Sequence, residues 1–285
     1  MASMRDIQRR RSSISSIQQI TKAMKLVSTV KLQKTKSRAE SSKPYFDYMY
    51  ATVTAMLARS GNINHRYLTA GESAKKAVLV ITSNRGLAGG YNSNVTKLVT
   101  DSDMAREDLV LYTIGRKGRE TLERKGYQVK EDYSDVINAP IFRDAQEISE
   151  QLLKDFAEGK VGEIYLAYTS FKNTVVHEPK LIKLLPVEFD ESELTREEAN
   201  TPMNYEPAEE EALDIIIPKY VTSLLYGALV EAQASENGAR MQAMDSATSN
   251  AEEMIDKLSL QYNRARQGSI TQELTEIIAG AEAIS

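Results

Sequence analysis

The 285-residue chain contains no cysteine, no tryptophan and only two histidines. The absence of cysteine excludes disulfide bonds and thiolate-bound metal, and it fits a reducing compartment. His65 and His177 lie far apart in the sequence without the spacing of metal ligands, so we expect two surface side chains and no metal site. No unbroken run of about 18 apolar residues occurs, and the N-terminus lacks the apolar segment of a signal peptide. We therefore expect no direct membrane insertion.

Proline is absent from residues 219–285, and both proline and glycine are absent from residues 2–43. Apolar residues recur with helical spacing in both stretches. At about 1.5 Å per residue the C-terminal helix would be roughly 100 Å long, which is more than a compact domain of this size can bury. We expect two long terminal helices that pack against each other, antiparallel because a domain separates them, with other proteins covering the remaining surface.

The N-terminal helix has apolar residues at steps of three, four and seven, which predict one buried stripe made of Ile7, Ile14, Ile17, Met24, Val27 and Val30. We expect Pro44 to kink or interrupt this helix. The C-terminal helix has small residues on or near one face, with Met254 and Leu258 between them: Ala232, Ala239, Ala243, Ala247, Ala251 and Ala265. Small side chains let two helices approach closely, and a repeat near 3.5 residues predicts a left-handed coiled coil.

The middle of the chain alternates β-branched runs with helical patterns. Strands are predicted at residues 77–82, 109–114, 164–169 and 181–187. Helices are predicted from about Ser93, from Gly118 to about Gly126, and from Asp144, acting as an N-cap, to Glu158, with Gly159 as the stop. Strands that alternate with helices indicate βαβ units and a parallel sheet. The predicted fold class is α/β: a long antiparallel coiled coil of the terminal helices plus a central Rossmann-like α/β domain.

This pattern divides the chain into four segments. We expect an N-terminal coiled-coil helix at 1–60, a central α/β domain at 75–187, an acidic connector at 188–211 and a C-terminal coiled-coil helix at 212–285. The three consecutive glutamates at 209–211 are expected at a helix N-terminus, where the helix dipole favours negative charge.

The glycine-rich segment TSNRGLAGGYN at 82–92 follows a predicted strand, as a phosphate-binding loop would. However, Gly86, Gly89 and Gly90 do not form GxGxxG, and no Gly-Lys-Ser/Thr sequence is present. We interpret the segment as a tight strand-to-helix turn whose glycines permit close packing. No nucleophile and general base can be paired from the sequence, so we expect no catalytic residue, no cofactor and no metal.

The net charge of −4 conceals an asymmetry between the two ends of the chain. Residues 1–43 carry eleven Lys or Arg against Asp6 and Glu40, whereas residues 208–285 carry thirteen acids against five bases. One interpretation is that both sets are solvated faces with weak cross-helix pairs. The other is that the basic helix also faces acidic loops of a partner. Nucleic-acid binding is disfavoured by the acidic overall composition and by the few aromatics interleaved in residues 1–43.

Three stretches resemble the γ subunit of F-type ATP synthases: ITKAMKLVSTVKL at 20–32, SNRGLAGGYN at 83–92 and the tail at 236–283. The tail contains Ile-Thr-x-Glu-x-x-Glu-x-x-x-Gly-Ala-x-Ala at 270–283, the family's signature pattern. The three stretches occur in the family's order, so the resemblance covers essentially the whole chain. The chain lacks the cysteine-containing insertion of chloroplast forms, which favours the bacterial type.

The resemblance implies a non-catalytic central shaft that couples proton translocation through a membrane c ring to ATP synthesis and hydrolysis on a hexamer of α and β subunits. It implies partners α, β, ε and the c ring, one copy per complex, and a peripheral place on the cytoplasmic face of the bacterial cell membrane. Two alternatives remain open: an α/β enzyme whose helices only oligomerise it, and a nucleic-acid binder.

The resemblance also implies which residues contact these partners. Ile277, Ile278 and Ala281 are expected in an apolar sleeve formed by α and β. The residues expected at polar loops of a β subunit are Arg266, Gln267 and Thr271, and those expected near acidic loops are Met24, Lys25, Arg85 and Gly86. Tyr205 and Glu206 are expected to meet ε and the c ring.

Overall fold

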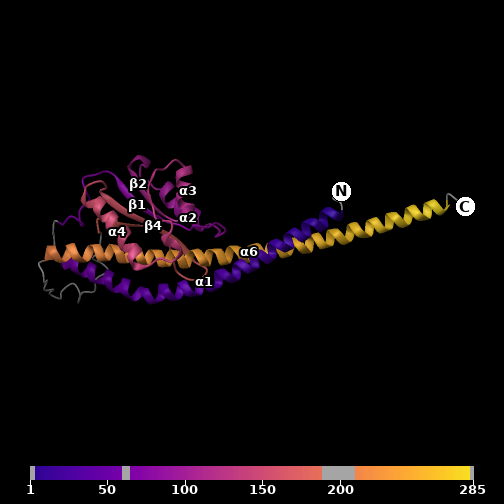
Figure 1. The fold of residues 1–285 in the computed structure, drawn as a ribbon, viewed down its shortest axis with the longest axis horizontal. Helices are drawn as coiled ribbons and strands as arrows, with labels where there is room; N and C mark the ends of the chain where they lie inside the picture. The colour runs from indigo at the N-terminus through magenta and orange to yellow at the C-terminus, as the bar shows by residue number, and fades with distance from the viewer. Residues whose placement is uncertain (1–3, 60–64, 188–208, 283–285) are drawn as a thin grey trace. The chain divides into compact units, whose positions relative to one another are not determined.

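The computed structural model describes residues 4–59, 65–187 and 209–282 (Figure 1). The chain divides into two compact units, Met1–Ser28 with Arg240–Ser285, and Thr29–Ala239. We call them the coiled-coil unit and the central unit. The two long helices, α1 (Met4–Arg59) and α6 (Glu209–Glu282), contribute to both.

The coiled-coil unit is an antiparallel helix pair, as predicted. The Gln18 side-chain amide donates to the Glu252 carboxylate at 3.0 Å. Seven residues further along α1, Lys25 pairs with Asp245 at 2.6 Å, and Asp245 lies seven residues back along α6. Contacts that advance along one helix while they retreat along the other establish the antiparallel direction.

The seam of this pair is built from smaller and more polar residues than the sequence predicted. On α1 the buried positions follow a seven-residue spacing that includes Ile7, Thr21 and Ser28. On α6 Met244, Thr248 and Ala251 are buried. Three members of the predicted apolar stripe lie outside the seam and are 50–69% exposed: Ile17, Val27 and Val30. Met254, placed by the sequence between the small residues of α6, is exposed as well.

The physical reason for this correction is the close approach of the two helices. Small side chains suit a narrow seam, and a Ser or Thr hydroxyl can be satisfied by the carbonyl one turn earlier in its own helix. The Thr21 hydroxyl donates to the Gln18 carbonyl at 3.1 Å in this way, and the Thr248 hydroxyl lies 2.7 Å from the Met244 carbonyl. Hydrophobicity alone therefore predicted burial wrongly for three of the six residues of the stripe.

Neither long helix ends at its internal proline. We expected Pro44 to kink or interrupt α1; the interruption is wrong, because α1 continues to Arg59. Pro44 and Glu40 are both exposed, so the carbonyl of Glu40, which loses its helical donor at Pro44, can bond to water. Helix α6 begins at Glu209, ten residues before the proline-free stretch, and runs through Pro218. The glutamates at 209–211 form its first turn, as expected.

The central unit contains a five-stranded sheet in the order β3-β2-β1-β4-β5. The strands are β1 (Lys76–Ile81), β2 (Leu109–Ile114), β3 (Val129–Asp132), β4 (Glu163–Phe171) and β5 (His177–Leu185). The first four are parallel, as predicted, but β5 is antiparallel to β4. The short connection between β4 and β5 permits only a hairpin, which explains the difference. The sequence missed β3, whose residues VKED contain no apolar run.

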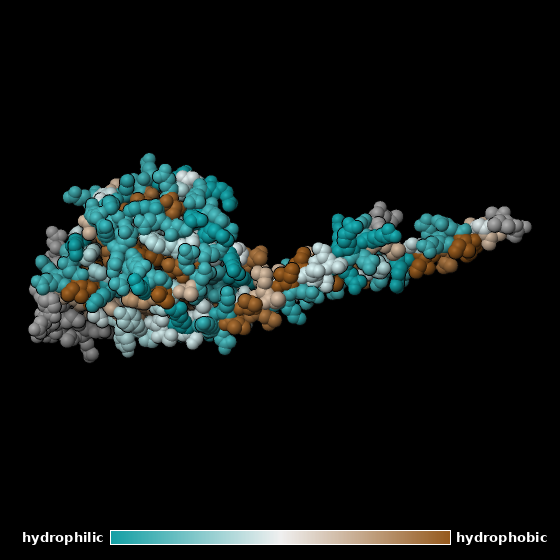
Figure 2. All heavy atoms as spheres, in the orientation of Figure 1, coloured by the Kyte–Doolittle hydropathy of each residue, from teal (hydrophilic) through white to brown (hydrophobic). Residues whose placement is uncertain are grey.

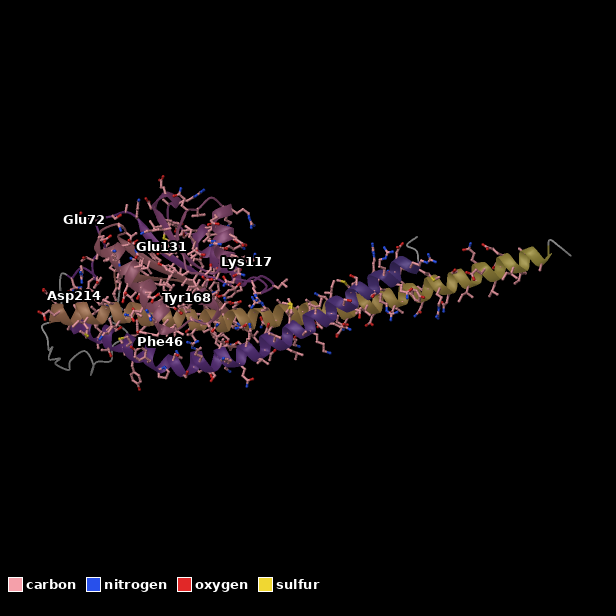
Figure 3. All side chains as sticks on the ribbon, in the orientation of Figure 1. Phe46, Glu72, Lys117, Glu131, Tyr168 and Asp214 are labelled. Atoms are coloured by element: carbon pink, nitrogen blue, oxygen red, sulfur yellow. The ribbon has the colours of Figure 1, made fainter. Side chains whose placement is uncertain are left out.

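Helices cover both faces of the sheet. On one face α2 (Tyr91–Thr100) and α3 (Arg116–Arg124) bury an apolar cluster of Val78, Val80, Val95, Val99, Leu111 and Leu122. On the other face α4 (Phe142–Ala157) packs together with the end of α1 and the first half of α6. The residues that α6 contributes to this core follow helical spacing: Leu213, Ile217, Tyr220, Val221, Leu225, Ala228, Leu229 and Ala232. The Phe46 ring, on α1, is labelled in Figure 3. A Cβ added at Gly227 of α6 would lie 3.1 Å from this ring, so the glycine lets the ring approach α6 closely.

The packing of α6 accounts for its apolar composition. Among the described residues, α6 is the one helix long and apolar enough to cross a membrane by length and composition, with a best window of mean hydropathy 1.4. That window is 56% buried within the protein. A helix that lies in the core of a soluble domain passes the same test.

Two predicted helix boundaries can be compared with the structure. Asp144 is not the N-cap of α4: it lies at the third helical position, where its carboxylate accepts from the Ile141 N–H at 2.9 Å. The predicted stop is confirmed, because α4 ends at Ala157 and Gly159 has a φ of 70°, which favours glycine.

Candidate partner interfaces

The outer end of α6 lacks a helical partner among the described residues. Continued fourteen residues beyond the Gln18–Glu252 pair, the register of the coiled coil brings Met4, the first residue of α1, level with Arg266. Every α6 residue from Ile270 to Ala281 is exposed. Figure 2 shows apolar residues gathered along one side of this outer part of α6. These residues therefore present their side chains to whatever surrounds the helix.

The apolar row at this end is longer than the predicted one, which contained Ile277, Ile278 and Ala281. Ile277 and Ile278 are 67% and 60% exposed. Leu274, one turn earlier, and Ile270, two turns earlier, extend the row and are 55% and 49% exposed. The steps of four residues from Ile270 to Leu274 and three from Leu274 to Ile277 were a signal available in the sequence. Burying one such side chain contributes about 1.5–3 kcal/mol, so an isolated chain leaves considerable binding free energy unused here.

The predicted polar contact residues lie just before this row and are also exposed. The Thr271 hydroxyl donates to the Gln267 carbonyl at 2.9 Å, so it is already satisfied within the helix. Among the described residues, no hydrogen bond or ion pair engages the side chains of Arg266 and Gln267. Tyr205 and Glu206, expected at a second interface, lie outside the described residues.

Met24 and Lys25 lie half-buried at the edge of the coiled-coil seam. Lys25 pairs with Asp245 at 2.6 Å, and both side chains are partly exposed. A pair of this kind stabilises by about 0–1 kcal/mol, so it leaves the lysine available to a second acidic group at little cost.

Arg85 and Gly86 are exposed in the turn that joins β1 to α2. The turn is held by side-chain bonds: the Asn92 carboxamide oxygen accepts from the Ser83 N–H at 2.9 Å, and Asn84 accepts from the Arg116 N–H at 2.9 Å. Leu87 has a φ of 61°, which is strained for a side-chain-bearing residue, and is largely exposed. These bonds therefore hold the turn in one conformation, with Arg85, Gly86 and Leu87 exposed.

The glycines of this turn have different roles. Gly89 has a φ of 55°, so a glycine is favoured there, as expected for a tight turn. A Cβ at Gly86 would meet no atom within 4 Å, so close packing within the chain does not require glycine at that position. The interpretation of close packing was wrong for Gly86.

The position where doubly wound sheets bind nucleotides is occupied by α6. Such ligands lie at the carboxyl ends of the strands, where the strand order reverses, which in this sheet is between β1 and β4. There the Tyr91 hydroxyl donates to the Ala232 carbonyl at 3.1 Å, and Ser235 donates to the Thr169 carbonyl at 3.2 Å. Both partners on α6 are fully buried.

Both histidines are more buried than we predicted. His65 is 7% exposed; its Nδ1 accepts from the Tyr67 N–H, and its Nε2 lies 3.2 Å from Asp214. His177 is half-buried beside Phe171, and its Nε2 is buried with no hydrogen-bond partner among the described residues. Burial lowers the pKa of His177 from its ordinary value. Surface placement was wrong for both because neighbouring elements cover them.

A buried charge cluster ties α4 to the sheet, and no pattern in the sequence indicated it. Asp155 is fully buried and accepts hydrogen bonds from Tyr112, from Lys130 at 2.5 Å and from Lys160 at 3.2 Å. Burial alone would raise the pKa of Asp155, but these hydrogen bonds outweigh it and hold the pKa at about 2. Among the described residues, no group of three or more His, Cys, Asp or Glu side chains could hold a metal.

Comparison with known proteins identifies the family. The family model described as ATP synthase matches residues 3–284. The ATP synthase gamma chain of Lachnoclostridium phytofermentans is 68% identical over 291 positions, which cover 100% of both chains. The sodium ion specific gamma chain of Acetobacterium woodii is 42% identical, with 98% of each chain covered.

Solved structures agree with this assignment. A chain of the Tetrahymena thermophila mitochondrial ATP synthase, from a structure of its central stalk and c ring, matches with a TM-score of 0.60 and 26% identity over 80% of this chain and 99% of that one. A chain of the Euglena gracilis mitochondrial ATP synthase matches with a TM-score of 0.70 over 99% and 94% of the two chains. At 17% identity that second likeness shows the fold alone. The family expected from the sequence is confirmed: the chain belongs to the ATP synthase gamma-chain family.

Proposed function

We propose that this chain is the central rotor shaft of an F-type ATP synthase and couples proton translocation through a membrane c ring to ATP synthesis and hydrolysis on an α/β hexamer. The observation that carries the proposal is the coiled-coil unit, whose seam is small and polar while apolar side chains such as Ile17 and Ile277 face outward. A helix pair of this kind gains its main apolar burial from surrounding proteins. The related solved structures include F1 and c-ring parts, which supports these partners.

The shaft itself is proposed to be non-catalytic and to need no cofactor. Support comes from the turn after β1, which has no phosphate-binding sequence, and from α6, which fills the nucleotide position of the central sheet. Catalysis is then a property of the assembled complex, with one copy of this chain in each complex.

The proposed contacts follow the exposed surfaces. Ile277, Ile278 and Ala281 face the apolar sleeve of the hexamer, and a bearing of apolar contacts holds the helix without directional bonds at one angle. Arg266, Gln267 and Thr271 meet polar loops of a β subunit. Met24, Lys25 and the projecting turn at Arg85–Gly86 meet acidic loops.

The opposite end of the rotor is proposed to involve the connector. Tyr205 and Glu206 contact ε and the c ring, which places the chain peripherally on the cytoplasmic face of the bacterial membrane. The rotor is proposed to have four segments. These are coiled-coil helices at 1–60 and 212–285, a central domain at 75–187 and a connector at 188–211.

Reconstitution tests the proposal. The purified chain alone is expected not to hydrolyse ATP, whereas its addition to α and β should produce an active complex, and addition of ε and the membrane part should allow ATP-driven proton pumping. ATP turnover by the chain alone, free of α and β, would contradict it. Charge reversal at Glu206 should uncouple pumping from hydrolysis while hydrolysis by the soluble part persists.

A double substitution tests the polar contacts separately. Gln267→Ala with Thr271→Ala should weaken binding to the hexamer, because each hydrogen bond to a charged group contributes about 1.5–3 kcal/mol. The matched control is Gln261→Ala, an exposed glutamine in the same helix. Unchanged assembly and unchanged coupled synthesis in the double variant would remove these residues from the interface.

A further inference from the structure

The last two turns of α6 within the central unit, Glu231–Gly238, are held by polar contacts from several directions. The Tyr91 hydroxyl, on α2, donates to the Ala232 carbonyl at 3.1 Å. The Gln233 amide donates to the Asn138 carbonyl at 2.7 Å, at the end of the short helix η2 (Val136–Asn138). We call Glu231–Gly238 and the groups that bond to it the collar.

The hairpin of β4 and β5 holds the remaining side of the collar. The Glu231 carboxylate accepts from the Phe171 N–H at 3.3 Å, and the Ser235 hydroxyl donates to the Thr169 carbonyl at 3.2 Å. A Cβ at Gly238 would lie 2.4 Å from Nε2 of His177, so this glycine lets the imidazole lie against the helix. Glu231, Ser235 and Gly238 are spaced by four and three residues and therefore lie on one face of α6.

The collar concentrates directional bonds that are sparse in the packing before it. From Leu213 to Leu229, α6 contacts the core mainly through apolar side chains, with directional bonds spread along it at Asp214, Thr222 and Tyr226. Apolar contacts do not specify one rotation of the helix as strictly as directional bonds do. In the collar, Ala232 and Ser235 are fully buried, so a small rotation of α6 would leave the Tyr91 hydroxyl or the Thr169 carbonyl without its partner.

We propose that the collar fixes the rotation of α6 about its own axis where the helix leaves the central unit, and that Tyr91 and Gln233 are positioning residues for coupling. This inference rests on the proposed rotor function. Torque that enters α6 from the surrounding hexamer has to reach the central unit without slip of the helix. Directional bonds to buried groups provide that resistance, and they surround the last residues of α6 that belong to this unit.

The experiment uses the complete ATP synthase complex with the double substitution Tyr91→Phe and Gln233→Leu. Both changes keep most of the side-chain volume. Tyr91→Phe removes the hydroxyl that bonds to Ala232, and Gln233→Leu removes the amide group whose nitrogen donates to Asn138. The control is Tyr165→Phe, the same change at a tyrosine that bonds to Glu163 outside the collar. Two quantities are measured: protons pumped per ATP hydrolysed against an increasing opposing gradient, and amide hydrogen exchange of the collar residues 231–238.

The double variant is expected to hydrolyse ATP but to pump fewer protons per ATP once the gradient opposes rotation, and its collar amides should exchange about tenfold faster. A loss of stability alone would lower hydrolysis and pumping together and leave their ratio unchanged. Gly238→Ala should act in the same direction, because the methyl group displaces His177. If the double variant fails to assemble, Tyr91→Phe alone is judged by the same two measurements.

The proposal is overturned if these variants keep the pumping ratio and the exchange rates of the Tyr165→Phe control. It is also overturned if exchange rises while the ratio stays constant at every gradient. Failure of the rotor function would look different, because the unaltered complex would then hydrolyse ATP without pumping any protons.

Discussion

The hydroxyl of Thr248 lies 2.8 Å from the hydroxyl of Thr21, in the middle of the seam between α6 and α1. Thr248 is also 2.7 Å from the Met244 carbonyl, and its single proton serves one of these acceptors at a time. Both threonines are buried. Ile17 and Ile20, on the same helix as Thr21, are 50% and 59% exposed. The seam of the coiled-coil unit thus buries hydroxyl groups beside a few apolar side chains while several large apolar side chains stay exposed, unlike the seam of a self-sufficient helix pair.

Replacement of Thr248 by leucine should destabilise the isolated chain. The added volume forces the closely packed helices apart, at a cost of about 1–3 kcal/mol. Urea unfolding followed by circular dichroism measures the change. Met254→Leu is the matched control, because Met254 is on the same helix but exposed. Equal stabilities of the two variants would contradict the close approach of α1 and α6 at this level.

Substitution of the outer apolar row should affect assembly and not the fold. Ile277→Asp with Ile278→Asp should leave the unfolding of the isolated chain unchanged, because both side chains are already exposed. Binding to the α/β hexamer should weaken by about 1.5–3 kcal/mol for each isoleucine that becomes buried. Titration of labelled chain into purified hexamer measures this. Gln272→Asp, at a polar position of the same segment, is the control, and an equal loss of affinity in it would count against an apolar sleeve.

Asp155→Asn should lower the stability of the central unit at neutral pH by about 3 kcal/mol, near the lower end for a broken buried pair because Lys130 and Lys160 are partly exposed. The folded pKa, about 2, lies below the ordinary value of 3.8. The contribution is therefore complete above about pH 4 and is lost as the pH falls towards 2.

Urea unfolding at pH 7 and at pH 3 measures this effect. The difference between the unaltered chain and Asp155→Asn should be smaller at the lower pH. Asp103→Asn, an exposed aspartate in the same unit, serves as the control and should show little difference at either pH. A difference for Asp155→Asn that does not depend on pH would show that its carboxylate is not held ionised by the lysines.

His177 should give the chain a second pH dependence, at milder pH. Its folded pKa is lowered by burial, so the unfolded chain binds more protons below about pH 6.5 and stability falls as the pH drops through that value. His177→Gln should flatten the stability profile between about pH 7 and pH 5. Parallel profiles for the two chains, measured by urea unfolding across this range, would show that burial does not disfavour the charged imidazole.

The parts of the fold that the sequence predicted are those in which one physical signal dominates. The run LVLYTI gave the bounds of β2, Leu109–Ile114, and the absence of helix breakers gave the long helices. β3 could not be found, because its VKED sequence forms a strand only through pairing with β2. The antiparallel direction of β5 depends on the hairpin that precedes it, which residue propensities do not encode.

The candidate interface could be predicted only in part, for a related reason. The exposed row was partly recognised at Ile277 and Ile278, because no residue of the shorter helix remained to cover them. The seam was misread at Ile17, Val27 and Val30, since hydrophobicity alone does not show which face of a helix is turned towards its partner when that partner is held by threonine and serine. The burial of His65 and the partners of Asp155 depend on tertiary contacts across long sequence separations.

The first half of α6 completes the core of the central unit, and this has a consequence for biosynthesis. Strands β1 and β2 are made early, but the residues that cover one face of their sheet, from Leu213 to Ala232, leave the ribosome only after most of the chain has been translated. Until then Leu79, Ile81 and Ile114 lack part of their cover, and an exposed sheet face of this kind is prone to aggregation. The nascent chain therefore passes through a long interval in which a chaperone has a defined surface to protect.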